Sequence, residues 1–141
     1  MSMTNRPAPA GAIDLDGFYV VAREPGHVEK ELPVWACKRP GAVNFAESGG
    51  RSIERVDIAE VPGAWHLRNV LSADECDQLV ELSEALGYHD DAPVSLPRSI
   101  LHNGNFTWVV DESVDGPIWD RCKGFFENSD HTSLRPQGLN A

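Results

Sequence analysis

The chain has 141 residues and a mass of 15.5 kDa, which is the size of one ordinary domain. Hydrophobic residues make up 41% and aromatic residues 8%, and this composition excludes a wholly disordered or fibrous chain. Twelve basic against 22 acidic residues give a formal net charge of −10, so the surface repels phosphate and anionic lipid. We therefore expect no nucleic-acid partner and no membrane partner.

The chain carries no targeting or spanning signal that we can identify from its sequence. Its longest apolar runs are a few residues, far short of the roughly 20 that cross a bilayer. The cysteines are odd in number and widely separated, so we expect reduced, mostly buried thiols at Cys37, Cys76 and Cys122. These features predict a cytoplasmic protein.

The first 62 residues predict strands and turns. Residues 1–12 are small and proline-containing, so we expect a disordered tail there. Residues 13–62 predict a small β-rich segment, because frequent Pro-Gly and Gly-Gly pairs exclude long helices before residue 64. Three strand-like runs within it, at residues 18–22, 32–37 and 52–58, predict a small antiparallel outer sheet.

The next segment predicts a strand followed by a clearly marked helix. Residues 64–71 alternate apolar and polar side chains as a half-buried strand does. Ser72 and Glu75 form a capping-box pattern and Gly87 is a stop signal, so we predict a helix over residues 73–86. One face of this helix is expected to carry Cys76, Leu79, Val80, Leu82, Ser83 and Leu86.

The remaining elements are a long loop, a strand and a second helix. Residues 88–105 contain two prolines and many polar groups, and we expect this loop to carry function. Residues 106–110 predict a strand, and Pro117 is expected to open a helix over residues 117–126. Trp108 and Trp119 lie on apolar faces at strand and helix spacing, so core packing is the favoured interpretation.

Two histidines and a carboxylate form the only pattern that suggests a metal site. His89, Asp91 and His131 have the residue types of the facial triad of non-haem Fe(II) oxygenases. However, His89 follows a helix stop and His131 lies in a polar tail, whereas metal ligands need rigid placement. We therefore favour solvated loop residues, and we interpret the acidic pairs Asp90-Asp91 and Asp111-Glu112 in the same way.

The loop also holds a group suited to binding a polar substrate. Arg98 together with Asn103 and Asn105 could grip a carboxylate or a peptide group. The alternative is a loop pinned by bonds from amide side chains to the backbone, and the tight-turn chemistry of Asn-Gly favours it. The sequence has no nucleophile elbow and no phosphate-binding loop.

Several ordered motifs resemble one enzyme family. The run Leu71-Ser72-Ala73-Asp74-Glu75-Cys76, before a helix, resembles the "LS-x-x-EC" opening of the Fe(II)/2-oxoglutarate-dependent dioxygenases of the prolyl 4-hydroxylase-like group. The run Pro117-Ile118-Trp119-Asp120-Arg121 looks like that family's "LW-x-R" helix. Residues 98–111 look like its Arg/Asn loop and following strand, and residues 136–141 like its "P-x-GLN" step into the catalytic β-helix.

The resemblance implies an α+β fold in which two main helices buttress short antiparallel strands, the flank of an incomplete double-stranded β-helix. Residues 63–141 would be the N-terminal support region, and the loop at residues 98–105 would rim the active site. The catalytic residues, with the two His and the carboxylate that hold Fe(II) and the anchor for 2-oxoglutarate, would lie beyond residue 141. This chain alone is then expected to bind no cofactor and to be inactive.

Two functional alternatives remain open from the sequence. The first is the N-terminal part of such an oxygenase, acting on a protein side chain or a small molecule. The second is a freestanding, non-catalytic binding or scaffold module. Self-association through an exposed sheet edge is expected for the first, because an incomplete sheet exposes apolar area, whereas a cooperative monomer would favour the second.

Overall fold

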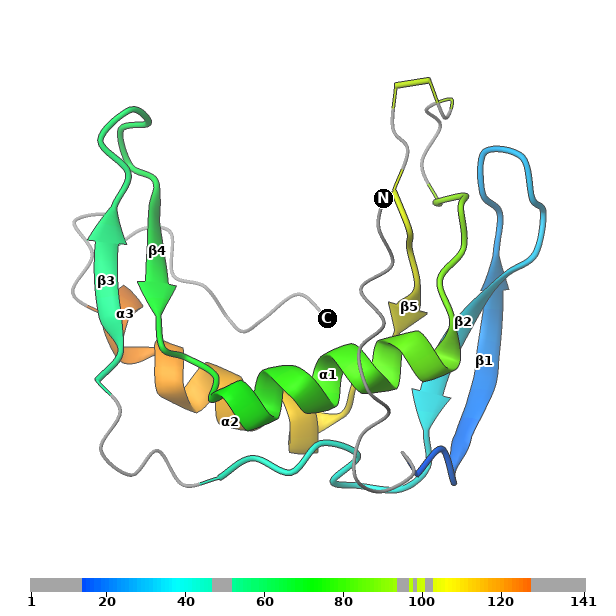
Figure 1. Cartoon of the computed structure of the whole chain (residues 1–141), viewed down its shortest axis with the longest axis horizontal. Coiled ribbons are helices and arrows are strands. Elements are labelled where there is room, and N and C mark those ends of the chain that lie inside the picture. The colour runs from blue at the N-terminus through cyan, green and yellow to red at the C-terminus, as the bar shows by residue number, and fades with distance from the viewer. Residues whose placement is uncertain (1–13, 47–51, 94–96, 98, 101–102, 128–141) are drawn as a thin grey trace.

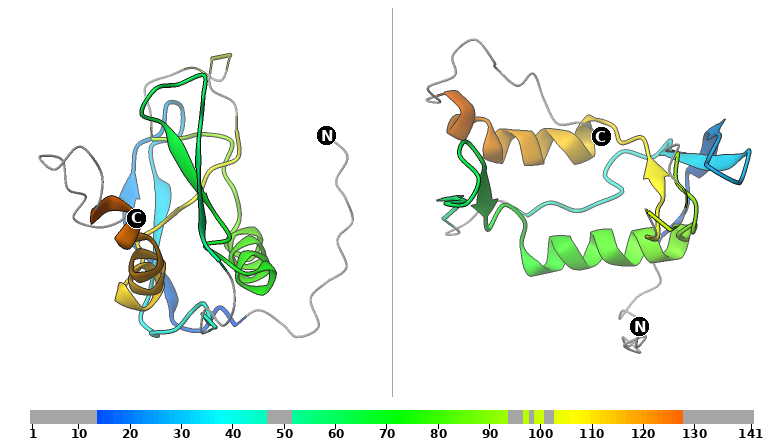
Figure 2. Two further views of the ribbon diagram at one scale, coloured as in Figure 1. Left: turned by 90° about the vertical axis from the view of Figure 1, so that its left-hand side faces the viewer. Right: turned by 90° about the horizontal axis from the view of Figure 1, so that it is seen from above.

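A computed structural model describes residues 14–46, 52–93, 97, 99–100 and 103–127. It has the expected mixed α+β composition, with two main helices and two small sheets. The elements are β1 (Phe18–Glu24), β2 (Leu32–Cys37), β3 (Glu54–Asp57), β4 (Trp65–Arg68), α1 (Ala73–Leu86), β5 (Thr107–Trp108), α2 (Glu112–Cys122) and α3 (Gly124–Glu127). Figures 1 and 2 show α1 and α2 running alongside each other, with the β3–β4 hairpin at one end and the other sheet at the opposite end.

The strands pair differently from the single antiparallel outer sheet that the sequence predicts. β1 and β2 are antiparallel, from Phe18↔Cys37 to Glu24↔Leu32, and β5 joins β2 in parallel through Trp35↔Trp108. The third expected strand, β3, belongs to a separate two-stranded sheet with β4. The reason is proximity in the chain, since β3 and β4 are joined by a short connection whose closure costs little entropy.

Helix α1 begins and ends where the sequence predicts. Ser72 Oγ accepts a hydrogen bond from the backbone N–H of Glu75 at 3.1 Å, and Glu75 Oε1 accepts one from the N–H of Ser72 at 2.8 Å. The helix ends at Gly87, whose φ of 96° lies in the left-handed region that glycine tolerates. The capping box is therefore confirmed.

The buried face of α1 is rotated from the one that the sequence predicts. Leu82 and Ser83 are buried as expected, but Cys76 and Val80 are exposed and Glu75 is completely buried. The helix turns Glu75 inward because its carboxylate finds an ion-pair partner on α2. The expectation of mostly buried thiols also fails at Cys76, while Cys122 is buried and Cys37 is half-buried.

Helix α2 begins five residues before the predicted start, and Pro117 lies inside it. Its N-cap is Asp111, whose side chain accepts a hydrogen bond from the N–H of Ser113 at 2.9 Å. A proline within a helix removes one backbone bond, and here the helix continues past that loss. The predicted end is split, because Lys123 separates α2 from the short helix α3.

Aromatic side chains connect the elements around a small core. Trp119 and Trp65 both contact Phe126, at ring-centroid distances of 5.7 and 5.0 Å, and Trp108 contacts Phe18 at 5.5 Å. Trp108 and Trp119 are half-buried, and each packs on another ring as the core interpretation expects. The buried apolar residues of the described ranges are Leu32, Val34, Val43, Leu82, Ala92, Val114 and Cys122.

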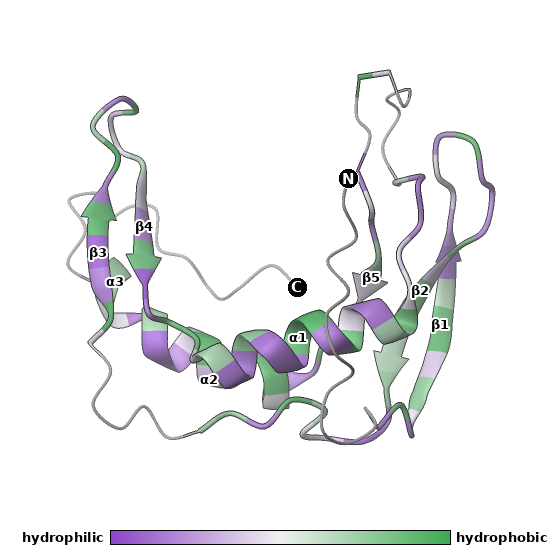
Figure 3. Ribbon diagram, in the orientation of Figure 1, coloured by the Kyte–Doolittle hydropathy of each residue, from purple (hydrophilic) through white to green (hydrophobic). Residues whose placement is uncertain are grey.

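Hydrophobic and hydrophilic residues alternate along both main helices (Figure 3). None of the described helices is long and apolar enough to cross a membrane. Large hydrophobic side chains nevertheless remain exposed on the outer side of β1, where Tyr19 and Val21 are 38% and 48% exposed. The described surface therefore mixes polar and apolar residues on the helices and is partly apolar at the sheet.

Candidate functional site

A buried ion pair joins the two main helices. Arg121 Nη1 donates to Glu75 Oε1 at 2.8 Å, and Nη2 donates to Oε2 at 2.9 Å. The same two nitrogens donate to the backbone oxygens of Val70 and Ala46, at 2.8 and 2.7 Å. Glu75 also accepts hydrogen bonds from the N–H groups of Ser72 and Ala46. We call this set of bonds the Glu75–Arg121 clamp. Each of its bonds holds either a helix or a connecting segment in place.

Both members of the clamp are charged at neutral pH. The hydrogen bonds from Arg121 outweigh the effect of burial and, with the backbone N–H groups of Ser72 and Ala46, lower the pKa of Glu75 to about 2. Glu75 in turn raises the pKa of Arg121. A carboxylate held ionised in this way does not exchange protons near neutral pH, so the clamp positions elements and does not act as a general acid or base.

Asp91 is the second buried carboxylate, and it is not the solvated loop residue that the sequence favours. Its side chain is 3% exposed and accepts four backbone hydrogen bonds. Oδ1 accepts from the N–H of His27 and Ala92, both at 3.0 Å, and Oδ2 accepts from those of Val28 and Glu29, both at 2.7 Å. Burial opposes ionisation, but the backbone donors outweigh it and lower the pKa of Asp91 to about 2.

The close approach of Asp91 to the β1–β2 loop depends on Gly26. A Cβ atom at Gly26 would lie 2.4 Å from Asp91 Oδ2 and 2.8 Å from Leu32 Cδ1. No side chain fits at those distances without movement of the loop or of Asp91. Glycine at this position therefore lets three successive N–H groups wrap around one carboxylate.

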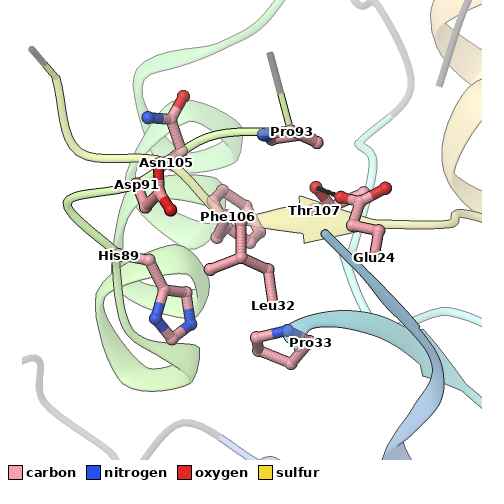
Figure 4. A pocket seen from close by; sticks show the side chains of 9 residues that line it. All are labelled: Glu24, Leu32, Pro33, His89, Asp91, Pro93, Asn105, Phe106 and Thr107. Atoms are coloured by element: carbon pink, nitrogen blue, oxygen red, sulfur yellow. Dashed lines mark hydrogen bonds between the residues drawn. The ribbon is translucent and has the colours of Figure 1, made fainter. Parts of the chain in front are cut away.

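A shallow pocket lies beside Asp91 (Figure 4). Its polar lining includes His89, Asn105, and Glu24, which accepts a hydrogen bond from Thr107 Oγ1 at 3.0 Å. Its volume of about 10 Å³ is close to the minimum that holds one water molecule. The described pocket is therefore too small to enclose 2-oxoglutarate or an amino-acid side chain.

His89 and Asp91 do not fit as ligands of Fe(II). A carboxylate has about four lone-pair positions, and all those of Asp91 are directed at backbone N–H donors. The His89 imidazole points away from the Asp91 carboxylate (Figure 4), and His131 lies outside the described residues. Within the part of the chain that the structure describes, no three His, Cys, Asp or Glu side chains are grouped so that they could hold a metal.

The candidate substrate-binding residues are brought together in part. Asn105 Nδ2 donates to the backbone oxygen of Asn103 at 3.0 Å and to its side-chain Oδ1 at 2.7 Å. The backbone of Asn105 also pairs with that of His89 in both directions, at 2.7 and 2.8 Å. Arg98 lies outside the described residues.

No pattern in the sequence predicts that Glu75 pairs with Arg121. Glu75 was expected only as the partner of Ser72, and Arg121 only as part of a helix motif. They lie 46 residues apart, so no periodic pattern connects them. The one signal in the sequence that could indicate the ion pair is that each of the two motifs carrying the family resemblance contains one of its members, the acid Glu75 and the base Arg121.

Comparison of the chain with family models, with curated proteins and with solved structures finds no match in any of the three. The Glu75–Arg121 clamp and the β1–β2 loop that is bound by Asp91 are therefore the features from which a function has to be inferred. Both consist of charged groups that are fully engaged by donors or acceptors within the fold.

Proposed function

We propose that this chain is the N-terminal support region of an Fe(II)- and 2-oxoglutarate-dependent oxygenase of the prolyl 4-hydroxylase-like group. The Glu75–Arg121 clamp carries the proposal. Glu75 belongs to the "LS-x-x-EC" motif and Arg121 to the "LW-x-R" motif, the two runs on which the resemblance chiefly rests. Their side chains meet in a bidentate, buried ion pair, so the two motifs have one joint structural task.

That task is to fix α1 against α2. A buried ion pair with two parallel N–H···O bonds restricts both the distance and the rotation of the groups that it joins. Arg121 also holds the carbonyls of Val70 and Ala46, which lie before α1 and in the segment that follows β2. In this proposal the clamped helices buttress a sheet whose flank includes β1, β2 and β5, and the remaining strands of the β-helix come from later residues.

The oxidising chemistry would be supplied by Fe(II) and 2-oxoglutarate held by residues that follow position 141. No step of it is assigned to this chain, because His89 and Asp91 do not fit the metal. The substrate would be a protein side chain or a small molecule, with Asn103 and Asn105 at the rim of the site.

The test is to express the product of the complete reading frame and to measure succinate formation from 2-oxoglutarate with Fe(II). We expect the later residues to contain a His-x-Asp pair and a distal His, and replacing the first of these histidines by Ala to abolish turnover. The matched control is the 141-residue chain, for which we expect no turnover. A stop codon after Ala141, or a longer product that stays inactive with iron, contradicts the proposal.

The second candidate is a freestanding binding module, and the exposed edge strand β1 favours it. β1 lies at the edge of its sheet and exposes Tyr19 and Val21. An edge strand with apolar side chains can pair with a strand of another protein. Light scattering of the isolated chain separates the candidates, since self-association supports the incomplete oxygenase and a cooperatively unfolding monomer supports the module.

A further inference from the structure

The Asn103-Gly104 pair in the loop before β5 carries a chemical reactivity of its own, separate from the place at the rim that the proposed function gives it. Asn103 is exposed and is followed by Gly104, and Asn105 donates a hydrogen bond to its side-chain oxygen at 2.7 Å. We propose that Asn103 is a site of spontaneous deamidation, which converts it to aspartate and isoaspartate as the protein ages. This inference does not depend on the oxygenase assignment.

The reaction needs only this chain and water. The backbone nitrogen of Gly104 loses its proton to solvent base and attacks Cγ of Asn103, and the side-chain nitrogen leaves as ammonia with a proton from water. The new C–N bond closes a five-membered succinimide. Water then adds to one of its two carbonyl carbons, so the ring reopens as aspartate or as isoaspartate with no change in oxidation state.

Glycine at position 104 favours the attack. It has no Cβ, so its nitrogen can approach Cγ without the crowding that other residues impose. Among the described residues, the three atoms nearest to the Cβ that alanine would add belong to Tyr88, at 3.4 Å or more, which is ordinary van der Waals contact. The fold therefore accepts Gly104→Ala, and this variant removes the reactivity without removing the loop.

Asn105 activates the amide that is attacked. When Gly104 nitrogen adds to Cγ, negative charge develops on Asn103 Oδ1, and a donor already placed at that oxygen stabilises it. The backbone of Asn105 is fixed by its two bonds to His89, so the donor is held in position. The exposed asparagines Asn44 and Asn69 precede Phe45 and Val70, whose side chains hinder the same attack.

The change alters both charge and chain length at this loop. Deamidation adds one negative charge beside Asn105, and the isoaspartyl form adds one methylene group to the main chain two residues before the His89–Asn105 bridge. A site that begins as an amide donor and acceptor becomes an anion. The loop therefore differs chemically between newly made and aged protein.

The test is incubation of the purified chain at neutral and at mildly alkaline pH, followed by peptide mapping at acidic pH and mass spectrometry. We expect Asn103 to convert about tenfold faster than Asn44 and Asn69, since only Asn103 precedes glycine. The rate should rise with pH, and part of the product should be methylated by an isoaspartyl methyltransferase. An Asn103 that keeps its amide as long as the other two overturns the proposal.

Two variants separate the contributions. Gly104→Ala should lower the rate at Asn103 about tenfold while the unfolding temperature stays unchanged. Asn105→Ala should slow it several-fold, because the donor to Oδ1 is lost. A rate that is unchanged or faster in Asn105→Ala overturns the role given to Asn105, since that side chain would then only restrain Asn103.

Discussion

At the scale of single residues, a buried carboxylate must recover the hydrogen bonds that it loses with water. Glu75 recovers them from an arginine and two backbone N–H groups, whereas Asp91 uses backbone N–H groups alone. The bonds of Glu75 join two helices, and the bonds of Asp91 hold the β1–β2 loop. Neither leaves an oxygen free for a ligand, and the proposed role of these residues is therefore to position other elements.

Removing the arginine of the clamp should be costly. Arg121→Met removes the positive charge and both hydrogen bonds that face the buried Glu75 carboxylate, and it takes a donor from two carbonyls, so we expect the free energy of unfolding to fall by about 3–5 kcal/mol. The measurement is denaturation in urea. The matched control is Lys123→Met, because Lys123 forms an exposed ion pair with Asp120 at 3.1 Å and should contribute about 0–1 kcal/mol. Equal losses in both variants would contradict the assignment.

The sequence identifies these residues but not what they do. The Ser72–Glu75 capping box could be predicted because both residues lie within one turn. Three of the four donors to Asp91 precede it by 62 to 64 residues, and they are backbone groups that carry no side-chain signature. An acid that is bound by distant backbone therefore has the same local pattern as a solvated one.

At the scale of elements, local signals predict starts and ends better than partners. The bounds of α1 and β2 agree with the sequence because caps, stops and turn residues lie within a few positions of them. The prediction for the start of α2 is wrong because Pro117 is typical of a first helical position, whereas the N-cap of the helix is Asp111, interpreted from the sequence only as half of an acidic pair. The pairing of β3 with β4 was missed because short strands with similar composition do not specify their partners.

The β1–β2 loop depends on one acid, and its neighbour provides the control. In Asp91→Asn, an NH2 group, which can only donate, replaces one carboxylate oxygen and faces backbone N–H groups that also donate, so the loop should loosen. We expect hydrogen exchange at the amides of Val28 and Glu29 to accelerate by at least about tenfold. Asp90→Asn changes an exposed carboxylate and should leave both amides protected. Unchanged protection in Asp91→Asn would show that the loop is held by other contacts.

At the scale of the whole molecule, the buried carboxylates of Glu75 and Asp91 make the free energy of unfolding depend on pH. The pKa of Glu75 falls from 4.5 to about 2, and that of Asp91 falls from 3.8 to about 2. Both shifts are downward, so the stability that these groups add is complete above the unfolded values and is lost as the pH falls toward the folded ones.

We therefore expect the unfolding temperature to be nearly constant from neutral pH to about pH 5 and to fall between about pH 4.5 and pH 2. Circular dichroism melts at successive pH values measure it. The Asp91→Asn variant has lost one of the two groups, so its unfolding temperature should depend less on pH over that range. A wild-type unfolding temperature that stays constant down to pH 2 would contradict the pKa assignments.

The clamp binds the backbone of Ala46, and this determines which residues can occupy position 46. Both the N–H and the carbonyl of Ala46 are bound, while its side chain is exposed and takes no part. Selection at this position therefore acts on the backbone N–H and carbonyl and hardly at all on the side chain. Homologues of this fold can vary freely at position 46 with one exception, proline, which has no N–H to give to Glu75.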